Sequence, residues 1–261
     1  MSGLMQSTFQ NLKKHYRLID FDYLIVGAGG GGAGGESYWT TSGYGGSAGH
    51  GASLESSSSH GVGAGTFTIF ASADKIGTDI FTYSVTAGAG GAGGTPGYSG
   101  GSGYTGGTSS LSGRFGLTTF NSSTTRSAPG GAGGSGFSAS TNTGPAANGY
   151  WNLYYIETGD GGNPVYYRSG ASAGGTAGWR NGVAATGGGA GGPGGGGGIS
   201  QAGYQQGGYG GGGGPGTIII RCKTSDYTSY TTNAVVTTIV RSSIPYSVFK
   251  WTYSGSITFF T

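Results

Sequence analysis

The distribution of glycine constrains this chain more than any other feature of its sequence. Of the 65 glycines in 261 residues, only Gly3 precedes residue 27 and only Gly255 follows residue 216. Between those positions about one residue in three is glycine, a density otherwise typical of collagen and of low-complexity chains. We therefore divide the chain into an N-terminal docking segment with a first strand (1–26), a glycine-rich body (27–216) and a C-terminal β-strand region (217–261).

Collagen and disorder are the two states that such a density usually indicates. Collagen needs glycine at every third position and abundant proline, whereas here the period is broken and the chain has 7 prolines. Disorder is typical of Gly/Ser chains that bury too little apolar area. This body, however, contains alternating runs at 66–70 and 80–86 and aromatic-dense runs at 151–156 and 165–167. Because alternation of this kind is typical of strands, we expect an ordered body.

Runs of glycine suggest how the body is built. A polyproline-II-like helix has three residues per turn and no internal hydrogen bonds, so its amides must bond to neighbouring segments. The expected runs are 27–35, 88–94, 130–136, 186–198 and 207–216. The predicted fold class is mostly β: a glycine-rich body of short strands and packed polyglycine-II-like segments, with a C-terminal β extension. The sequence leaves open whether the runs pack as such helices or form loops of a β fold.

The ends of the chain differ from the body. Apolar spacing over Met5–Arg17 predicts a short helix. Residues 217–222 and 233–241 are predicted strands, because β-branched residues dominate them. Residues 247–253 and 256–260 flank Gly255 and predict a hairpin.

The string DYLIVGAGGGGAGG (22–35) matches the dinucleotide fingerprint G-x-G-x-x-G. That fingerprint works only where a helix follows and points its N-terminus at a pyrophosphate. The residues after Gly35 have no helical period, so we reject a nucleotide site. Histidines at 15, 50 and 60 have no metal-ligand spacing, and no carboxylate pair for glycan cleavage is identifiable. We therefore expect neither an enzyme nor a cofactor or metal.

Charge and hydropathy restrict the partners. The formal net charge is only +3, and the one basic cluster, 13–17, suits a solvated face or a docking arm better than nucleic acid. Cys222 lies in an apolar strand and predicts a buried thiol. There is no apolar run long enough to cross a bilayer as a helix and no apolar core of a secretory signal. We expect no nucleic-acid binding and no membrane insertion.

Several stretches, in order, resemble the glycine-rich domain of bacteriophage tail-fibre and related virion proteins. Residues 22–27 are similar to its opening strand, 83–94 to its middle strand and glycine turn, 121–123 to a short motif, and 213–221 to its closing strand. The likeness covers roughly 20–223. More loosely, the body resembles the tip adhesins of T-even-like long tail fibres, although the head does not resemble their attachment domain.

The resemblance implies a virion protein that is made in the host cytoplasm, contains no cofactor and contacts other fibre, tail or capsid subunits, with a homotrimer as one expected assembly. It further implies a receptor, either a host-surface glycan or an outer-membrane protein. Loops rich in Tyr, Trp, Ser and Gly are typical of binding surfaces, because Tyr and Trp give a large contact area at low entropy cost. The candidate receptor contacts are Tyr38, Trp39, Tyr98, Tyr104, Tyr150, Trp151, Tyr154, Tyr155, Tyr166, Tyr167, Arg168 and Trp179.

Two other functions remain open on the sequence. One is a virion decoration or connector protein without receptor binding, favoured by the long glycine-poor tail. The other is an ice-binding glycine-helix protein, which would need a flat and regular Thr/Ala face. The segments between the glycine runs are irregular, which argues against that face.

Overall fold

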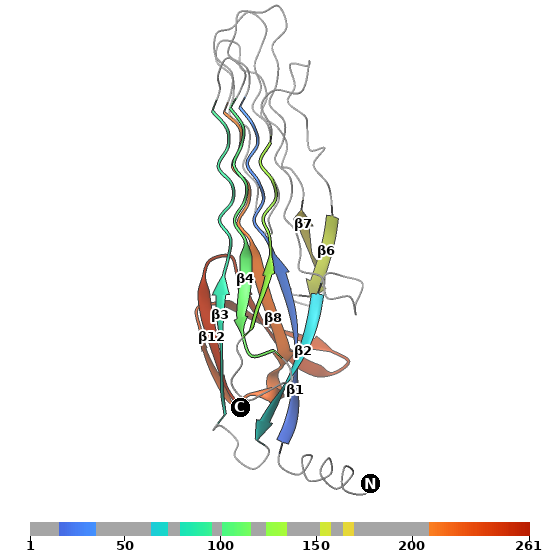
Figure 1. The fold of residues 1–261 in the computed structure, drawn as a ribbon. Coiled ribbons are helices and arrows are strands. Elements are labelled where there is room, and N and C mark those ends of the chain that lie inside the picture. The colour runs from blue at the N-terminus through green and yellow to red at the C-terminus, as the bar shows by residue number, and fades with distance from the viewer. Residues whose placement is uncertain are drawn as a thin grey trace, which may run out of the picture.

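A computed structural model describes a β-rich framework of this chain. The described residues are 16–34, 64–72, 79–95, 101–115, 124–134, 152–157, 164–169 and 209–261, with the backbone alone at 64–66, 152–157 and 164–169. The fold is mostly β, as the sequence predicts (Figure 1).

Strands account for most of the regular structure. Their bounds are β1 (Tyr16–Val26), β2 (Ala64–Ser72), β3 (Ile80–Thr86), β4 (Ser109–Gly113), β5 (Thr124–Ala128), β6 (Asn152–Glu157), β7 (Pro164–Ser169), β8 (Thr217–Lys223), β9 (Ser229–Thr232), β10 (Val235–Arg241), β11 (Ile244–Trp251) and β12 (Gly255–Phe260). A short 3-10 helix, η2 (Thr224–Asp226), follows β8.

The strands form two five-stranded sheets and one two-stranded sheet. Sheet 1 has the order β10-β11-β8-β1-β2, sheet 2 has the order β5-β4-β3-β12-β9, and β6 pairs with β7. Neighbouring strands are antiparallel in all three. The tail beyond residue 217 supplies strands to both five-stranded sheets.

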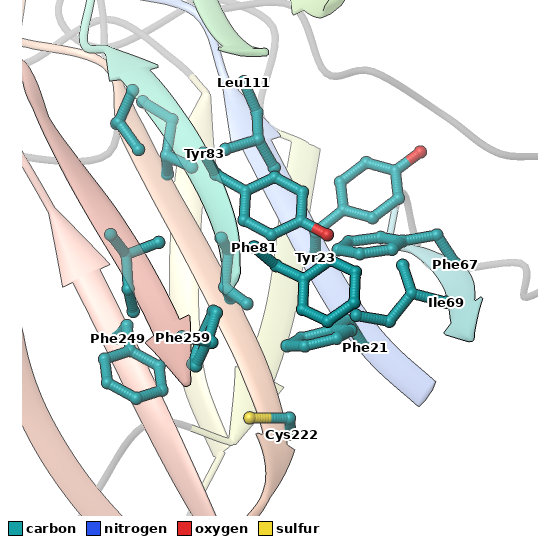
Figure 2. Close-up of a cluster of buried hydrophobic side chains, with 14 of the residues drawn as sticks. Phe21, Tyr23, Phe67, Ile69, Phe81, Tyr83, Leu111, Cys222, Phe249 and Phe259 are labelled. Carbon is teal, nitrogen blue, oxygen red and sulfur yellow. The ribbon is translucent and has the colours of Figure 1, made fainter. Parts of the chain in front are cut away.

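An aromatic core lies between sheets 1 and 2 (Figure 2). Phe21 of β1 stacks on Phe67 of β2 at 4.9 Å between ring centroids, and it lies 5.1 Å from the ring of Phe259 in β12. Aromatic pairs at these separations are worth about 0.5–1.5 kcal/mol beyond their area burial. The buried hydroxyl of Tyr83 donates to the carbonyl of Arg114 at 2.9 Å, so this polar group stays paired inside the core.

Within the part of the chain that the structure describes, five glycine-rich segments continue the strands into a bundle (Figure 1). They follow β1, β3 and β5 or precede β4 and β8, and they comprise residues 27–34, 87–95, 129–134, 101–108 and 209–216. Segment 27–34 lies at the centre, since it exchanges backbone hydrogen bonds with all four others. Strands from both sheets thus merge into one assembly.

The hydrogen bonds of the bundle repeat every three residues. The N–H groups of Ala28, Gly31 and Gly34 donate to carbonyls of the 101–108 segment at 2.8–3.0 Å. The other described segments bond to one another with the same period. A three-residue period with bonds only between segments is that of polyproline-II-type helices, so the glycine runs described here pack as such helices and are not loops of a β fold.

Close packing explains why the bundle needs glycine. A Cβ added at Gly31 would lie 1.9 Å from the carbonyl oxygen of Ala92, and one added at Gly30 would lie 2.0 Å from that of Ala132. These obstacles are backbone atoms, which cannot rotate away as a side chain can. Gly212 differs from these positions, because the nearest atom to a Cβ added there would be 3.5 Å away.

The predicted hairpin of 247–253 and 256–260 is wrong. Strand β11 pairs with β10 and β8 in sheet 1, whereas β12 pairs with β3 and β9 in sheet 2. The turn between them therefore crosses from one sheet to the other. Two adjacent strand patterns with a glycine between them are compatible with either outcome, and only the partners available on each sheet decide.

Other differences concern segments that the sequence left irregular or assigned to a helix. The segment between the predicted runs 88–94 and 130–136 (residues 95–129), expected to be irregular, contains β4, β5 and a fifth glycine segment, 101–108. Tyr16 and Arg17, expected at the end of a helix, begin β1. The rest of that predicted helix and the predicted run 186–198 lie outside the described residues.

Asn233 holds the crossover in place. Its Oδ1 accepts from the indole Nε1 of Trp251 at 3.1 Å and from the backbone N of Ser256 at 3.2 Å. A Cβ added at Gly255 would lie 2.0 Å from the same Oδ1. Glycine at 255 thus leaves room for the amide that joins the β9–β10 turn to the β11–β12 turn.

Candidate functional site

Tyr104 is the one predicted contact residue whose side chain the structure describes, and it is accessible. It lies in the 101–108 segment with 67% of its surface exposed. Its backbone is fixed, because its N–H donates to Ala92 at 2.9 Å and its carbonyl accepts from Gly31 at 2.8 Å. A rigid backbone that presents an exposed ring is a favourable arrangement for binding.

Five further candidates lie on the β6–β7 hairpin, where only the backbone is described. The register pairs Tyr154 with Tyr167 and Tyr155 with Tyr166, and it places Arg168 opposite Leu153. The hairpin thus brings four tyrosine positions into two directly opposed pairs.

The remaining candidates, Tyr38, Trp39, Tyr98, Tyr150, Trp151 and Trp179, lie outside the described residues. The points where the chain leaves the bundle toward them are nevertheless close together. Gly34 bonds to Gly101, and Gly210 bonds to Gly94, at 2.8 and 2.9 Å. These junctions form the end of the bundle that lies away from the sheets (Figure 1).

Sequence reasoning missed two exposed groups. Tyr209 begins the last bundle segment and is 57% exposed, although the run that contains it was expected to be core. The second group is the outer face of sheet 2, where Ser and Thr replace the aromatic residues of the inner face. The alternation within 80–86 carries that signal, since Thr82, Ser84 and Thr86 occupy three of its four exposed positions and Ile80 the fourth.

A small cavity lies at the end of the sandwich away from the bundle. Its volume is about 150 Å³, and it is lined by Tyr16, Phe70, Asp79, Ile80, Phe81 and Arg114. The Arg114 guanidinium carbon lies 5.7 Å from the centroid of the Phe81 ring, and Asp79 accepts a hydrogen bond from the backbone N of Ser72. Both charged side chains are therefore engaged in local structure.

Electrostatic interactions elsewhere in the described residues fit a structural role. Arg221 and Asp22 are opposite each other in β8 and β1 and form an ion pair at 2.6 Å. Burial raises the pKa of the Cys222 thiol well above its usual value, with Asp226 and Asp22 adding to the shift, so the thiol stays protonated. Burial also raises the pKa of Asp226.

The glycines of the fingerprint string are occupied by the bundle. The N–H groups of Gly29 and Gly32 donate to the carbonyls of Gly214 and Gly211, both at 2.9 Å. The whole 27–34 segment is buried. Amides committed in this way cannot cradle a phosphate, which agrees with the rejection of a nucleotide site.

Neither a protein-family model nor a curated protein sequence matches this chain. Within the described residues, no group of three or more His, Cys, Asp or Glu side chains is placed to hold a metal ion. In the same part of the chain no helix has the length and apolar character needed to span a bilayer.

Proposed function

We propose that this chain is a bacteriophage virion protein, a tail-fibre or fibre-tip adhesin module that binds a host-surface receptor. The observation that carries the proposal is the bundle itself. It is a rigid body whose far end gathers the junctions that lead to the aromatic-rich segments. Such an arrangement presents binding loops on an inflexible support, which limits the ordering entropy lost on binding.

The resemblance to phage glycine-rich domains gains support from how its stretches meet. Residues 22–27, 83–94 and 213–221 each span a junction between a strand and the bundle. Strands β1 and β8 pair directly, and the bundle segments that continue them bond to each other, as Gly29 does to Gly214 at 2.9 Å. The segment after β3 joins the same unit, because the N–H of Gly213 donates to the carbonyl of Gly91 at 2.7 Å. Three stretches far apart in sequence thus form one unit, as parts of a single domain should.

A second candidate is a virion decoration or connector protein that binds no receptor. It is favoured by the tail, which contributes β8, β9, β10, β11 and β12 to the sandwich and leaves Val235 and Val240 of β10 exposed at 59% and 63%. Exposed apolar side chains on a strand at the edge of a sheet suit contact with another subunit.

Adsorption of the labelled protein to intact candidate host cells, compared with its binding to isolated virions, tests the proposal. We expect saturable binding to cells that a Tyr38→Ala, Trp39→Ala double substitution abolishes. Val240→Ala, which truncates an exposed side chain of the sandwich, is the matched control and should adsorb to cells as the wild type does. Binding to virions alone, unchanged in the double variant, would instead establish the connector role.

A further inference from the structure

Most of the outer face of sheet 2 is built from hydroxyl residues. At one end of this face the row Ile80–Phe260–Ser229 adds an exposed isoleucine and a half-buried phenylalanine. The register aligns the other hydroxyl residues in three rows across the strands: Ser127–Ser110–Thr86, Thr125–Ser112–Ser84–Ser256, and Thr82–Thr258–Thr231. We call this set the hydroxyl face. Seven of its members are exposed and Ser110, Ser112 and Thr258 are half-buried. None is charged and none is large.

The hydroxyl face is a regular array. Strands lie about 4.8 Å apart, and residues on one face of a strand recur about every 6.8 Å. Thr82 and Thr258 share a hydrogen bond at 3.1 Å between their hydroxyls, and Ser112 and Thr125 share one at 2.8 Å. Each hydroxyl can both donate and accept. The face therefore offers a grid of groups that can pair with other hydroxyls in either direction.

The array continues onto the bundle as a strip of small residues. Beyond Thr86, exposure recurs at every third position, at Ala89, Ala92 and Thr95. Tyr104 lies beside this strip, since its N–H donates to the carbonyl of Ala92. Three residues further on, a Cβ added at Gly107 would lie 2.9 Å from the backbone N of Ala89, so positions of this set face the 87–95 segment. At about 3.1 Å per residue, Ala92 lies about 19 Å from Thr86. The surface is long and narrow, with one aromatic ring near its far end.

The composition of this surface selects among ligand classes. Nucleic acids and anionic membranes require lysine or arginine, which the hydroxyl face lacks. Protein interfaces favour Tyr, Trp, Met and Arg in their centres and are depleted in Ser and Ala. An uncharged, elongated ligand that is rich in hydroxyls fits all of these features. Ser, Thr and Ala also lose little side-chain entropy when a ligand immobilises them.

We propose that the hydroxyl face and the adjoining strip bind a neutral glycan chain laid along the long axis, with the Tyr104 ring as its stacking platform. A tyrosine combines an apolar ring face with a polar end, as a sugar combines C–H and O–H surfaces. This inference rests on the proposed adhesin role for the source of the glycan. It places one receptor contact on the side of the bundle and not only at its end.

The test is binding of the full-length protein to a printed array of neutral and acidic glycans. We expect saturable binding to neutral glycans that persists from about 0.15 M to about 1 M salt, where the Debye length falls from about 8 to about 3 Å. Tyr104→Ala and Ser84→Lys should each weaken binding at least about tenfold, which corresponds to about 1.4 kcal/mol. The matched controls are Tyr209→Ala, another exposed ring on the bundle, and Thr238→Lys, an exposed threonine of sheet 1. Both should stay within about twofold of the wild type on the same scale.

Four results would overturn the inference. The first is an array on which the wild type retains no neutral glycan, and the second is unchanged binding in both face variants. The third is a monomer–oligomer shift in sedimentation velocity that only the face variants abolish, which would assign the face to a second copy of the chain. The fourth is thermal hysteresis lost in Ser84→Lys, because the regular Ser/Thr/Ala surface that ice binding requires is present after all.

Adsorption to host cells separates this inference from the adhesin proposal. If the wild type, Tyr104→Ala and Ser84→Lys adsorb to host cells equally well, the glycan site fails as a receptor contact while the adhesin role stands. If the protein binds neutral glycans but adsorbs to no host cell, the glycan site stands and the adhesin role fails. Near-identical melting temperatures among the variants would establish that all of them are folded.

Discussion

A single methyl group in the centre of the bundle should destabilise the protein, and Gly31→Ala is the sharpest case. The added Cβ would lie 1.9 Å from the carbonyl oxygen of Ala92, so segments 27–34 and 87–95 would have to separate by more than 1 Å. That movement breaks the bonds from Gly91 to Gly29 and from Gly94 to Gly32, which are 2.9 and 2.8 Å long. At about 1 kcal/mol for each bond and about 1–3 kcal/mol for overpacking, the loss is about 3–5 kcal/mol.

Gly212→Ala is the matched control for this substitution. It adds the same methyl group to the same kind of segment, but the nearest atom is 3.5 Å away and the backbone of Gly212 is not left-handed. Alanine there restricts the unfolded chain, so the free energy of unfolding should stay constant or rise by up to about 1 kcal/mol.

Thermal unfolding followed by circular dichroism measures the difference between the two variants. A loss of about 3–5 kcal/mol corresponds to a fall of roughly 6–20 °C in Tm for a chain of this size. Gly30→Ala, which meets a different segment, should behave like Gly31→Ala. Equal melting temperatures for Gly31→Ala and Gly212→Ala would refute the reasoning, because the bundle would then tolerate a side chain at its centre.

Three other predictions concern the sandwich. Asn233→Ala should lower the free energy of unfolding in urea by about 1–3 kcal/mol, because it leaves the buried indole N–H of Trp251 unpaired. Gly255→Ala should destabilise the Asn233→Ala protein less than the wild type, since the Oδ1 atom that its Cβ would meet is gone, and additive losses would contradict this coupling. The raised pKa of Asp226 means that this carboxyl binds a proton more readily in the folded than in the unfolded protein, so its ionisation opposes folding above that pKa. The Asp226→Asn variant should therefore be more stable than the wild type at neutral pH and lose that advantage as the pH falls through the folded pKa. A difference in stability that does not change with pH would contradict the raised pKa. Cys222, 1% exposed and with a raised pKa, should react with iodoacetamide only as fast as the protein opens, and rapid labelling of the native protein would show that the thiol is accessible.

The sequence predicted the parts of the fold that depend on local pattern. The alternation over 80–86 gave β3 with its bounds, and the β-branched run at 217 gave the start of β8. The glycine runs at 27–35 and 88–94 became bundle segments, because no other residue permits such an approach of backbones. The segment 101–108 was missed, although Gly103 and Gly106 stand three residues apart at positions where an added Cβ would meet backbone atoms of the central segment. Tyr104 and Thr105, which stand between these glycines, concealed that period.

The candidate site was predictable only in part. Composition predicted that exposed tyrosines contact a receptor, and the Tyr104 side chain is exposed. The hydroxyl face could not be predicted in the same way, because its rows join strands that are up to 176 residues apart, as in the pair Thr82 and Thr258. A strand pattern states which residues share a face of that strand, but it does not state which other strand lies beside it.

Glycine density by itself determined what the glycine runs could not become: they could form neither α-helices nor a core of packed side chains. It also required that ordered glycine segments bond to one another, since such helices contain no bonds of their own. Tertiary structure decided everything that depends on a choice of neighbour. It sent β11 and β12 to different sheets, placed 27–34 at the centre of the bundle and aligned the hydroxyls of sheet 2. The physical reason is that backbone amides and carbonyls are the same in every residue, so only the packing of the whole chain determines which of them meet.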